Sequence, residues 1–234
     1  MTRWVLSPLR GEIKGLLAAV GPGEPLALPG AAEVFRCQGG ATLVGWTGVG
    51  ASAVRRTLEA LSAAEPRPEW AALVGVAGAL TLELEPGQVF RCPAAYADGE
   101  RIAGPQVRLP DALAGLPAAE VASVSTVADG ARKRALAQEL PGATLVDMET
   151  AWAFQVAVEL GLPLGAVRVV CDRRDQAIPD LGDGLDAVGR VRPLKFARQL
   201  LRNPSSAKAL PGLGRAFAQA TGALTPLLRA ALAG

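Results

Sequence analysis

Histidine is absent from the 234 residues of the chain, and cysteine occurs only three times. Without an imidazole, Ser-His-Asp hydrolysis, Cys-His proteolysis and His-ligated zinc or haem chemistry are excluded. The cysteines at positions 37, 92 and 171 lie too far apart in the sequence for a metal site or a redox pair, and we interpret each as a small buried residue. Any acid or base must therefore be a carboxylate, Lys, Tyr or Cys, and we expect no metal and no organic cofactor.

Long apolar runs are also missing, although half of the residues are hydrophobic. The longest run, residues 71–82, is interrupted by glycine and is shorter than the ~18–20 residues that span a bilayer. The first ten residues have neither a long apolar stretch nor a small-residue cleavage site, which argues against a secretory signal peptide. A chain of this length can bury most of its unfolded surface in one core. We therefore expect a folded, cytoplasmic protein.

Acidic residues are absent from residues 187–234, which hold eight basic side chains, whereas residues 1–186 hold 22 acids and 16 bases. Apolar residues recur at helical spacing between 210 and 228. We read 1–186 as one domain and 187–234 as a basic, amphipathic helical extension that prolines and glycines at 211, 212, 214, 222 and 226 break into shorter pieces. We favour packing of this extension on the domain. The alternatives are contact with an anionic membrane and, less favoured because the domain is acidic, contact with nucleic acid.

Apolar stretches alternate with amphipathic helical stretches along the first 180 residues. Strands are expected at residues 4–6, 41–46, 70–76, 88–92, 121–127, 143–146 and 164–171, and most are followed by a helix. Residues 93–117 carry turn signals and are expected to form a loop-rich insertion. This alternation predicts a single α/β domain whose mixed, mainly parallel central sheet is flanked by helices. Ligands of such domains bind at the carboxyl ends of the strands.

Carboxylates stand at three of these strand ends. Asp172 directly follows an apolar strand, where burial favours the protonated form of a carboxyl and suits a general acid. Asp147 and Glu149 lie where another strand passes into a helix, and Glu12 follows the first strand. Each residue alone is more simply a helix cap. Together they would suffice to cleave a glycosidic bond, in which positive charge builds on the sugar.

The order of these segments resembles the nucleoside phosphorylase and nucleosidase superfamily. This superfamily includes methylthioadenosine/S-adenosylhomocysteine nucleosidase, purine nucleoside phosphorylase and the hopanoid-associated nucleosidases. Residues 146–151 (VDMETA) resemble its V-E/D-M-E-x-A segment, and residues 168–175 (RVVCDRRD) resemble its R-x-(I/V)-S-D-x-x-D segment. Weaker similarities lie at 74–79 with 86–89 and at 8–12.

The resemblance implies a role for each acidic residue. Asp172 would protonate N7 of a purine, Glu149 would hold the ribose hydroxyls with Met148 packed on the sugar, and Glu12 would activate water. The substrate would also contact residues of the glycine-containing segment, Val76, Ala77 and Gly78. Asp129 stands in a region where the family's nucleosidases carry a base-stacking Phe; it either binds an exocyclic amino group or, as we favour, caps the following helix.

A glycine-rich turn at residues 45–50 is a candidate anion site, because its backbone N–H groups, including that of Gly48, could face a phosphate. Arg10 resembles one of the arginines that bind phosphate in the superfamily's phosphorylases, and the second such arginine has no counterpart. We therefore favour hydrolysis over phosphorolysis.

The sequence thus predicts a nucleosidase that hydrolyses the N-glycosidic bond of a 5′-modified purine nucleoside and releases adenine. Adenosylhopane-like compounds, methylthioadenosine and S-adenosylhomocysteine are the candidate substrates. The basic extension resembles that of the hopanoid-associated nucleosidases, which act on a lipid-linked nucleoside. The alternatives are a phosphate-dependent phosphorylase and a nucleoside-binding protein without turnover. By resemblance we also expect a homodimer, with Trp152 in the core and Phe154 at the interface.

Overall fold

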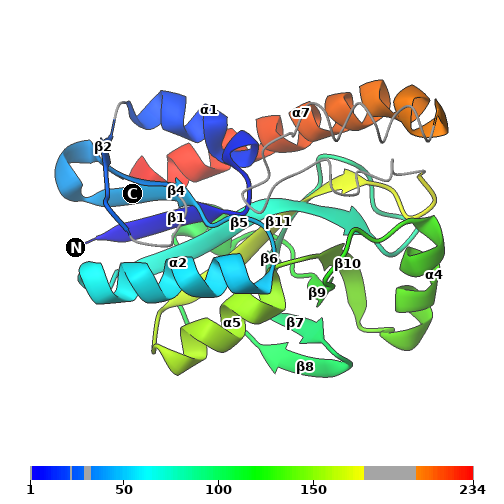
Figure 1. The fold of residues 1–234 in the computed structure, drawn as a ribbon, viewed down its shortest axis with the longest axis horizontal. Coiled ribbons are helices and arrows are strands. Elements are labelled where there is room, and N and C mark those ends of the chain that lie inside the picture. Colours follow the sequence, from blue (N-terminus) through cyan, green and yellow to red (C-terminus); the bar gives the residue numbers. More distant parts are fainter. Residues whose placement is uncertain (1, 22, 29–32, 177–203, 234) are drawn as a thin grey trace.

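The computed structural model describes residues 2–21, 23–28, 33–176 and 204–233. Within these ranges one large sheet runs through the molecule, with helices on both of its faces (Figure 1). The predicted fold class is confirmed: the chain forms a single mixed α/β unit with a C-terminal helix. Most of the basic residues of the predicted extension, from Arg190 to Arg202, lie outside the described residues.

Four parallel strands form the centre of the sheet. They are β1 (Arg3–Ser7), β4 (Thr42–Trp46), β5 (Trp70–Ala79) and β11 (Leu164–Asp172). They are apolar along their length because helices cover both faces. One edge is extended by β3 (Val34–Cys37) and β2 (Glu24–Pro25), both added in antiparallel orientation.

The other side of the sheet begins where β5 ends. There β10 (Ala143–Asp147) pairs antiparallel with the last residues of β5 and parallel with β9 (Glu120–Ser123). Beyond β9 lie β7 (Ala94–Ala97) and β8 (Glu100–Ala103), while β6 (Val89–Cys92) pairs with β11. The ends of β1, β5, β10 and β11 therefore come together in the middle of the molecule.

The expectation of a loop-rich insertion at residues 93–117 is wrong in part, because β7 and β8 form a hairpin there. Its turn consists of Asp98 and Gly99, whose φ angles are +50° and +82°. Positive φ at both central residues is the geometry of the tightest hairpin turns, and it explains why an Asp-Gly pair joins these strands. The remainder of this segment includes the short helix α3 (Asp111–Ala114).

Four further helices flank the sheet: α1 (Arg10–Val20), α2 (Ala51–Ala64), α4 (Gly130–Glu139) and α5 (Thr150–Glu159). Trp152 and Phe154 on α5 differ from expectation. Phe154 is fully buried in its own chain and Trp152 is only partly buried, so the predicted division between core and interface is wrong. Phe154 packs against β7 and β9 residues, which the sequence alone did not place beside it.

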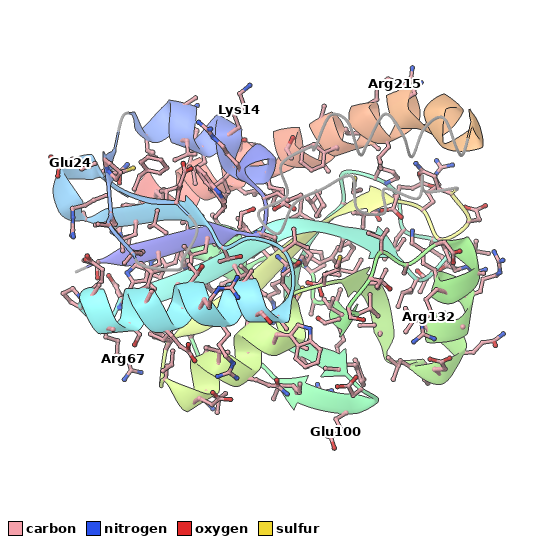
Figure 2. The ribbon with its side chains drawn as sticks, in the orientation of Figure 1. Lys14, Glu24, Arg67, Glu100, Arg132 and Arg215 are labelled. Carbon is pink, nitrogen blue, oxygen red and sulfur yellow. The ribbon has the colours of Figure 1, made fainter. Side chains whose placement is uncertain are left out.

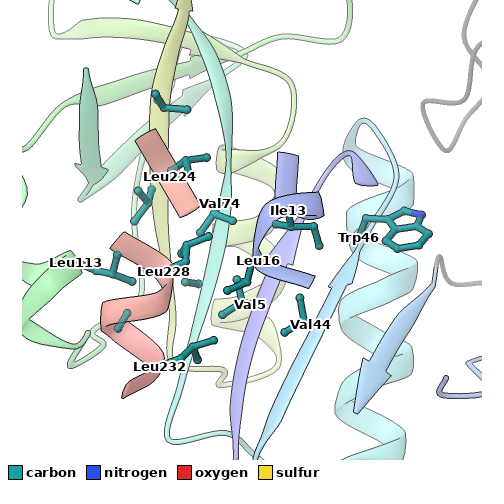
Figure 3. Close-up of a cluster of buried hydrophobic side chains, with 14 of the residues drawn as sticks. Val5, Ile13, Leu16, Val44, Trp46, Val74, Leu113, Leu224, Leu228 and Leu232 are labelled. Atoms are coloured by element: carbon teal, nitrogen blue, oxygen red, sulfur yellow. The ribbon is translucent and has the colours of Figure 1, made fainter. Parts of the chain in front are cut away.

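The C-terminal helix α7 (Pro204–Ala233) lies along α1 and over β11 (Figure 1). Leu224, Leu228 and Leu232 pack with Val5, Leu16 and other residues of the central strands (Figure 3). The predicted breaks at Pro211 and Pro226 do not occur, since burial of the apolar face outweighs the cost of a proline inside a helix. No helix in the described ranges is long and apolar enough to cross a membrane.

Candidate functional site

Six charged side chains in the described ranges are buried, and they gather at the carboxyl ends of β1, β5, β10 and β11. They are Glu12, Lys133, Asp147, Glu149, Arg168 and Asp172. Other charged residues, such as Lys14, Glu100 and Arg132, point outward from the fold (Figure 2). Because burying a charge is costly, a concentration of buried charges at the ligand-binding end of a parallel sheet marks a functional site.

Glu12 lies in the first turn of α1, and its carboxylate points back toward β1 and β5. One oxygen accepts hydrogen bonds from the Ser7 hydroxyl and from the backbone N–H of Leu9, the latter at 2.9 Å. The other accepts from the backbone N–H of Val76 at 2.9 Å. Burial raises the pKa of Glu12, and these three donors oppose the shift. The result is a held carboxylate with raised basicity, which is a property of general bases.

Glu149 lies at the start of α5 and accepts a hydrogen bond from the backbone N–H of Gly50 at 2.9 Å. Burial, with the negative charge of Asp147 as the next largest cause, raises the pKa of Glu149 to about 8. Arg168 acts in the opposite direction, and Glu12 contributes to the rise. Burial therefore favours the protonated form of Glu149.

Asp147 and Arg168 form a fully buried ion pair at the centre of this group. The Arg168 Nε donates to Asp147 Oδ2 at 2.7 Å, and Ser123 and Thr150 donate to the same carboxylate. The Nη1 of Arg168 donates to the carbonyl oxygen of Leu73 at 3.3 Å, whereas its Nη2 is buried without a hydrogen-bond partner. We call Glu12, Asp147, Glu149 and Arg168 the glutamate cluster. It contains three carboxyl groups and one guanidinium.

Asp172, at the end of β11, is paired with a residue that the sequence reading did not single out. Its Oδ2 accepts a hydrogen bond from the Nζ of Lys133, which comes from α4. The same ammonium donates to the carbonyl oxygen of Arg173 at 2.9 Å. Asp172 therefore has an ammonium partner from α4, which its position at the end of an apolar strand does not indicate.

Gly78 on β5 faces the Lys133–Asp172 pair. A Cβ at this position would lie 2.8 Å from Lys133 Cε and 3.0 Å from Asp172 Oδ2. Any larger residue would push the pair apart. The absence of a side chain at position 78 thus allows α4 and β11 to bring their charges together.

The remaining predicted site residues occupy the same end of the sheet in different roles. Val76 supplies its N–H to Glu12, Ala77 is buried in β5, and Met148 is partly buried between Asp147 and Glu149. Asp129 caps α4 by accepting the backbone N–H of Arg132 at 2.8 Å, the interpretation favoured from the sequence.

The predicted anion site has its own geometry. Arg10 is exposed, and its guanidinium carbon lies 5.2 Å from the centre of the Trp46 ring. Gly48 has a φ of +83°, a conformation that favours glycine. The N–H of Gly50 in the same turn is already bonded to Glu149. Part of this turn therefore serves the glutamate cluster.

Lys133, Arg168 and Ser7 belong to the site, although the sequence patterns predict no role for them. Arg168 stood inside a quoted motif, and a buried arginine in an apolar strand was its signal. Lys133 precedes the buried Leu136 by three residues, so both lie on the inner face of α4. This three-residue spacing from an apolar residue could have indicated that Lys133 is buried.

A cavity of about 370 Å³ lies elsewhere, beside the amino end of β11, and is lined by Leu164, Phe154 and Cys92 among others. None of the six buried charged residues lines it. Among the described residues, no group of three or more Cys, Asp or Glu side chains is arranged to hold a metal ion.

Comparison with known proteins gives matches in sequence and in fold. A sequence model described as the Phosphorylase superfamily matches residues 119–191, which include Asp147, Glu149, Arg168 and Asp172. No curated protein sequence matches the chain.

Several solved structures have a similar fold. Futalosine hydrolase of Helicobacter pylori is 17% identical, with a TM-score of 0.67 over 99% of this chain and 97% of that one. The 5′-methylthioadenosine/S-adenosylhomocysteine nucleosidase of the same organism is 17% identical, with a TM-score of 0.68 over 98% of each chain. The corresponding Neisseria meningitidis nucleosidase is 15% identical, with a TM-score of 0.67 over 97% of this chain and 98% of that one. The sequence match to the superfamily model is limited to residues 119–191, and the fold of the whole chain is similar to that of these nucleosidase structures.

Proposed function

We propose that the chain is a nucleosidase that hydrolyses the N-glycosidic bond of a purine nucleoside. The observation that carries this proposal is the division of the buried charges into two groups, one around Arg168 and one around Asp172, near the carboxyl end of β11. Arg168 of the glutamate cluster and Asp172 are four residues apart on β11, roughly 13 Å along a strand. A nucleoside would fit along this distance, with its sugar near the glutamate cluster and its base near Asp172.

The glutamate cluster is suited to the sugar. Cleavage of the bond to the base leaves positive charge on the ribose ring and its oxygen, and carboxylates placed beforehand stabilise that charge. Glu149 would hold the ribose hydroxyls. Glu12 would accept a proton from the water that attacks C1′, for which its raised pKa and its three fixed donors are suitable.

Asp172 is suited to the base. The electron pair of the broken bond moves into the purine, and a proton delivered to N7 makes the base a better leaving group. Asp172 would deliver this proton. Met148, Val76, Ala77 and Gly78 would line the site between the two groups.

Hydrolysis is supported over phosphorolysis by the turn at residues 48–50. The backbone N–H of Gly50, one of the donors of this turn, is already bonded to Glu149. A phosphate placed there would face a buried carboxyl group, an unfavourable neighbour for an anion. Arg10 and the N–H of Gly48 would remain to bind it.

The substrate class is proposed from similarity. Structures with this fold include a 5′-methylthioadenosine/S-adenosylhomocysteine nucleosidase with 5′-methylthioadenosine in its active site and a futalosine hydrolase. We propose a purine nucleoside modified at the 5′ position, with adenine as the released base. Adenosylhopane-like compounds, methylthioadenosine and S-adenosylhomocysteine remain the candidates. Nucleoside binding without turnover is the alternative.

Assembly and location also remain proposals. We propose a homodimer and a cytoplasmic protein. The division at residue 186 is likewise kept as a prediction, although α7 completes the core over β11. Because the apolar face of α7 is buried, membrane contact would rest on its exposed basic residues, such as Arg215 and Arg229, and not on insertion of its leucines.

The direct test is incubation of the purified protein with methylthioadenosine, S-adenosylhomocysteine and adenosine, with and without phosphate, followed by chromatography of the free base. We expect adenine release that does not depend on phosphate. The Glu12→Gln variant should bind the nucleoside but release adenine ~10²–10⁴ times more slowly. Release that requires phosphate would refute hydrolysis, and binding without release would indicate the binding protein.

A further inference from the structure

Lys133 is the only buried lysine among the described residues. Its hydrogen bonds go to Asp172 and Arg173 and not to the glutamate cluster. Its Nζ is enclosed by the Asp172 carboxylate, the carbonyl oxygen of Arg173 and the backbone of Gly78. Burying an ammonium is unfavourable unless it is paired. A lysine at this place therefore requires a reason beyond packing.

The pairing creates a problem for the proposed reaction. An ammonium in contact with a carboxylate favours the ionised carboxylate, and an ionised Asp172 has no proton to give to a base. A proton must reach Asp172 during the reaction. Among the side chains of the described residues, that of Lys133 is the one that donates a hydrogen bond to the Asp172 carboxylate.

We propose that Lys133 supplies, through Asp172, the proton that the leaving base takes up; this inference rests on the proposed nucleosidase function. As the bond between C1′ and the base breaks, its electron pair moves into the purine. The Asp172 carboxylate takes a proton from the Lys133 ammonium and passes it to N7. Lys133 is left as a neutral amine. It regains a proton from water after the base leaves, while the proton that Glu12 took from the attacking water returns to solvent.

The surroundings of Lys133 allow it to release a proton. Burial lowers the pKa of the Lys133 ammonium to about 8, while Cys171 and Asp175 act in the opposite direction. Together with Asp172, these are the titratable groups that face it from β11 and the segment that follows. The form with a charged Lys133 and an ionised Asp172 is the active one, so turnover should fall as pH rises above about 8. Ionisation of Glu149 acts on turnover in the opposite sense.

The test is the pH profile of kcat for the wild type, Lys133→Met, Lys133→Arg and the exposed control Lys14→Met. In Lys133→Met, Asp172 must take its proton from solvent, so we expect kcat to fall ~10²-fold at alkaline pH and much less in mild acid. Lys133→Arg keeps the charge, but a guanidinium does not release its proton, so it should not restore kcat. Lys14→Met should match the wild type. Circular dichroism and thermal melting report the folding of each variant.

The possible failures are distinguishable. If the wild type releases base but its kcat stays constant as the pH rises well above 8, Lys133 is not the proton source, whatever the variants do. An equal loss at every pH in Lys133→Met, or full recovery in Lys133→Arg, would also overturn the inference and leave a structural ion pair. If the wild type releases no base from any nucleoside, the proposed function fails, and this inference fails with it.

Discussion

The glutamate cluster and the Lys133–Asp172 pair lie at the same edge of the sheet and are equally buried, yet their charges are balanced differently. In the cluster, three carboxyl groups lie around one guanidinium, that of Arg168. Burial raises the pKa of Glu12, and burial together with repulsion from Asp147 and Glu12 raises the pKa of Glu149. In the pair, one carboxylate meets one ammonium. One region is thus deficient in positive charge and the other is neutral as a whole.

This difference suits the two halves of a glycosidic bond. A region that lacks a cation is stabilised when positive charge develops on a bound sugar, because the substrate then supplies the missing charge. The neutral ammonium–carboxylate pair holds a proton that can pass to the base, and it then carries one negative charge until Lys133 regains a proton from solvent. Burial is the largest cause of the raised pKa of Glu12 and Glu149, and the neighbouring charges and hydrogen-bond donors then raise or lower each value further.

The largest expected effect comes from breaking the pair. Asp172→Asn should lower kcat ~10²–10⁴-fold, because an amide cannot relay a proton to the base. Nucleoside affinity, measured by isothermal titration calorimetry, should change little. A variant that kept nearly normal kcat would show that Asp172 is not the proton donor.

The next effect concerns the cation of the glutamate cluster. Arg168→Met leaves the Asp147 carboxylate buried without its partner, and we expect a loss of about 3–5 kcal/mol in the free energy of unfolding. Urea denaturation measures this loss. Arg55→Met is the matched control, because the Arg55–Glu159 pair is exposed and should contribute no more than about 1 kcal/mol. Equal losses in the two variants would contradict the distinction between buried and exposed pairs.

Glu149→Gln tests the raised pKa of Glu149 through the pH dependence of the free energy of unfolding. With a pKa of about 8 in the folded state and an ordinary value of 4.5 in the unfolded state, Glu149 binds more protons when folded. Stability should therefore decrease between these values as pH rises, by up to about 1.4 kcal/mol per pH unit from this group. Glu12 contributes in the same direction.

The Gln variant carries no titrating group at this position, so its stability should fall less steeply with pH and exceed that of the wild type near pH 8, as thermal melting at several pH values will show. Its turnover should nevertheless be lower, because a neutral amide cannot oppose the positive charge of the sugar. If the two proteins lost stability in parallel as pH rises, Glu149 would not have the raised pKa.

Ser7→Ala is expected to give the smallest effect. The Ser7 hydroxyl donates to Glu12 and lowers its pKa, so removing it should raise that pKa further while two backbone donors remain. The acid limb of the pH–rate profile should move upward by about one unit, as the loss of a hydrogen bond to a charged group implies. A control, Ser52→Ala, removes a hydroxyl from α2. An unmoved acid limb would indicate that Glu12 is not the base that the profile reports.

Much of this arrangement follows from the sequence. The apolar stretches at 70–76 and 164–171 became the central strands β5 and β11, because a strand covered on both faces has a continuous apolar sequence. The acidic residues at strand ends were recognisable for the same reason, since each interrupts such a stretch. Two short motifs of the superfamily then indicated the fold.

Other features were beyond the reach of sequence. Phe154 was assigned to an interface because helical spacing does not tell which neighbour covers a face. The prolines of α7 predict breaks, but packing against α1, β5 and β11, which are distant in sequence, holds the helix together. Local preference is overridden by tertiary contacts in both cases.

The sequence by itself determined the alternation of strands and helices, the chemistry available without histidine and the placement of Glu12, Glu149 and Asp172 next to strand ends. These features depend on local pattern and residue type. Only the tertiary structure decided their electrostatic state. Lys133 reaches Asp172 across 39 residues of sequence, and the Gly50 N–H reaches Glu149 across 99. The protonation of a buried carboxyl group depends on such distant partners, and a linear pattern carries no record of which partners the fold will bring into contact.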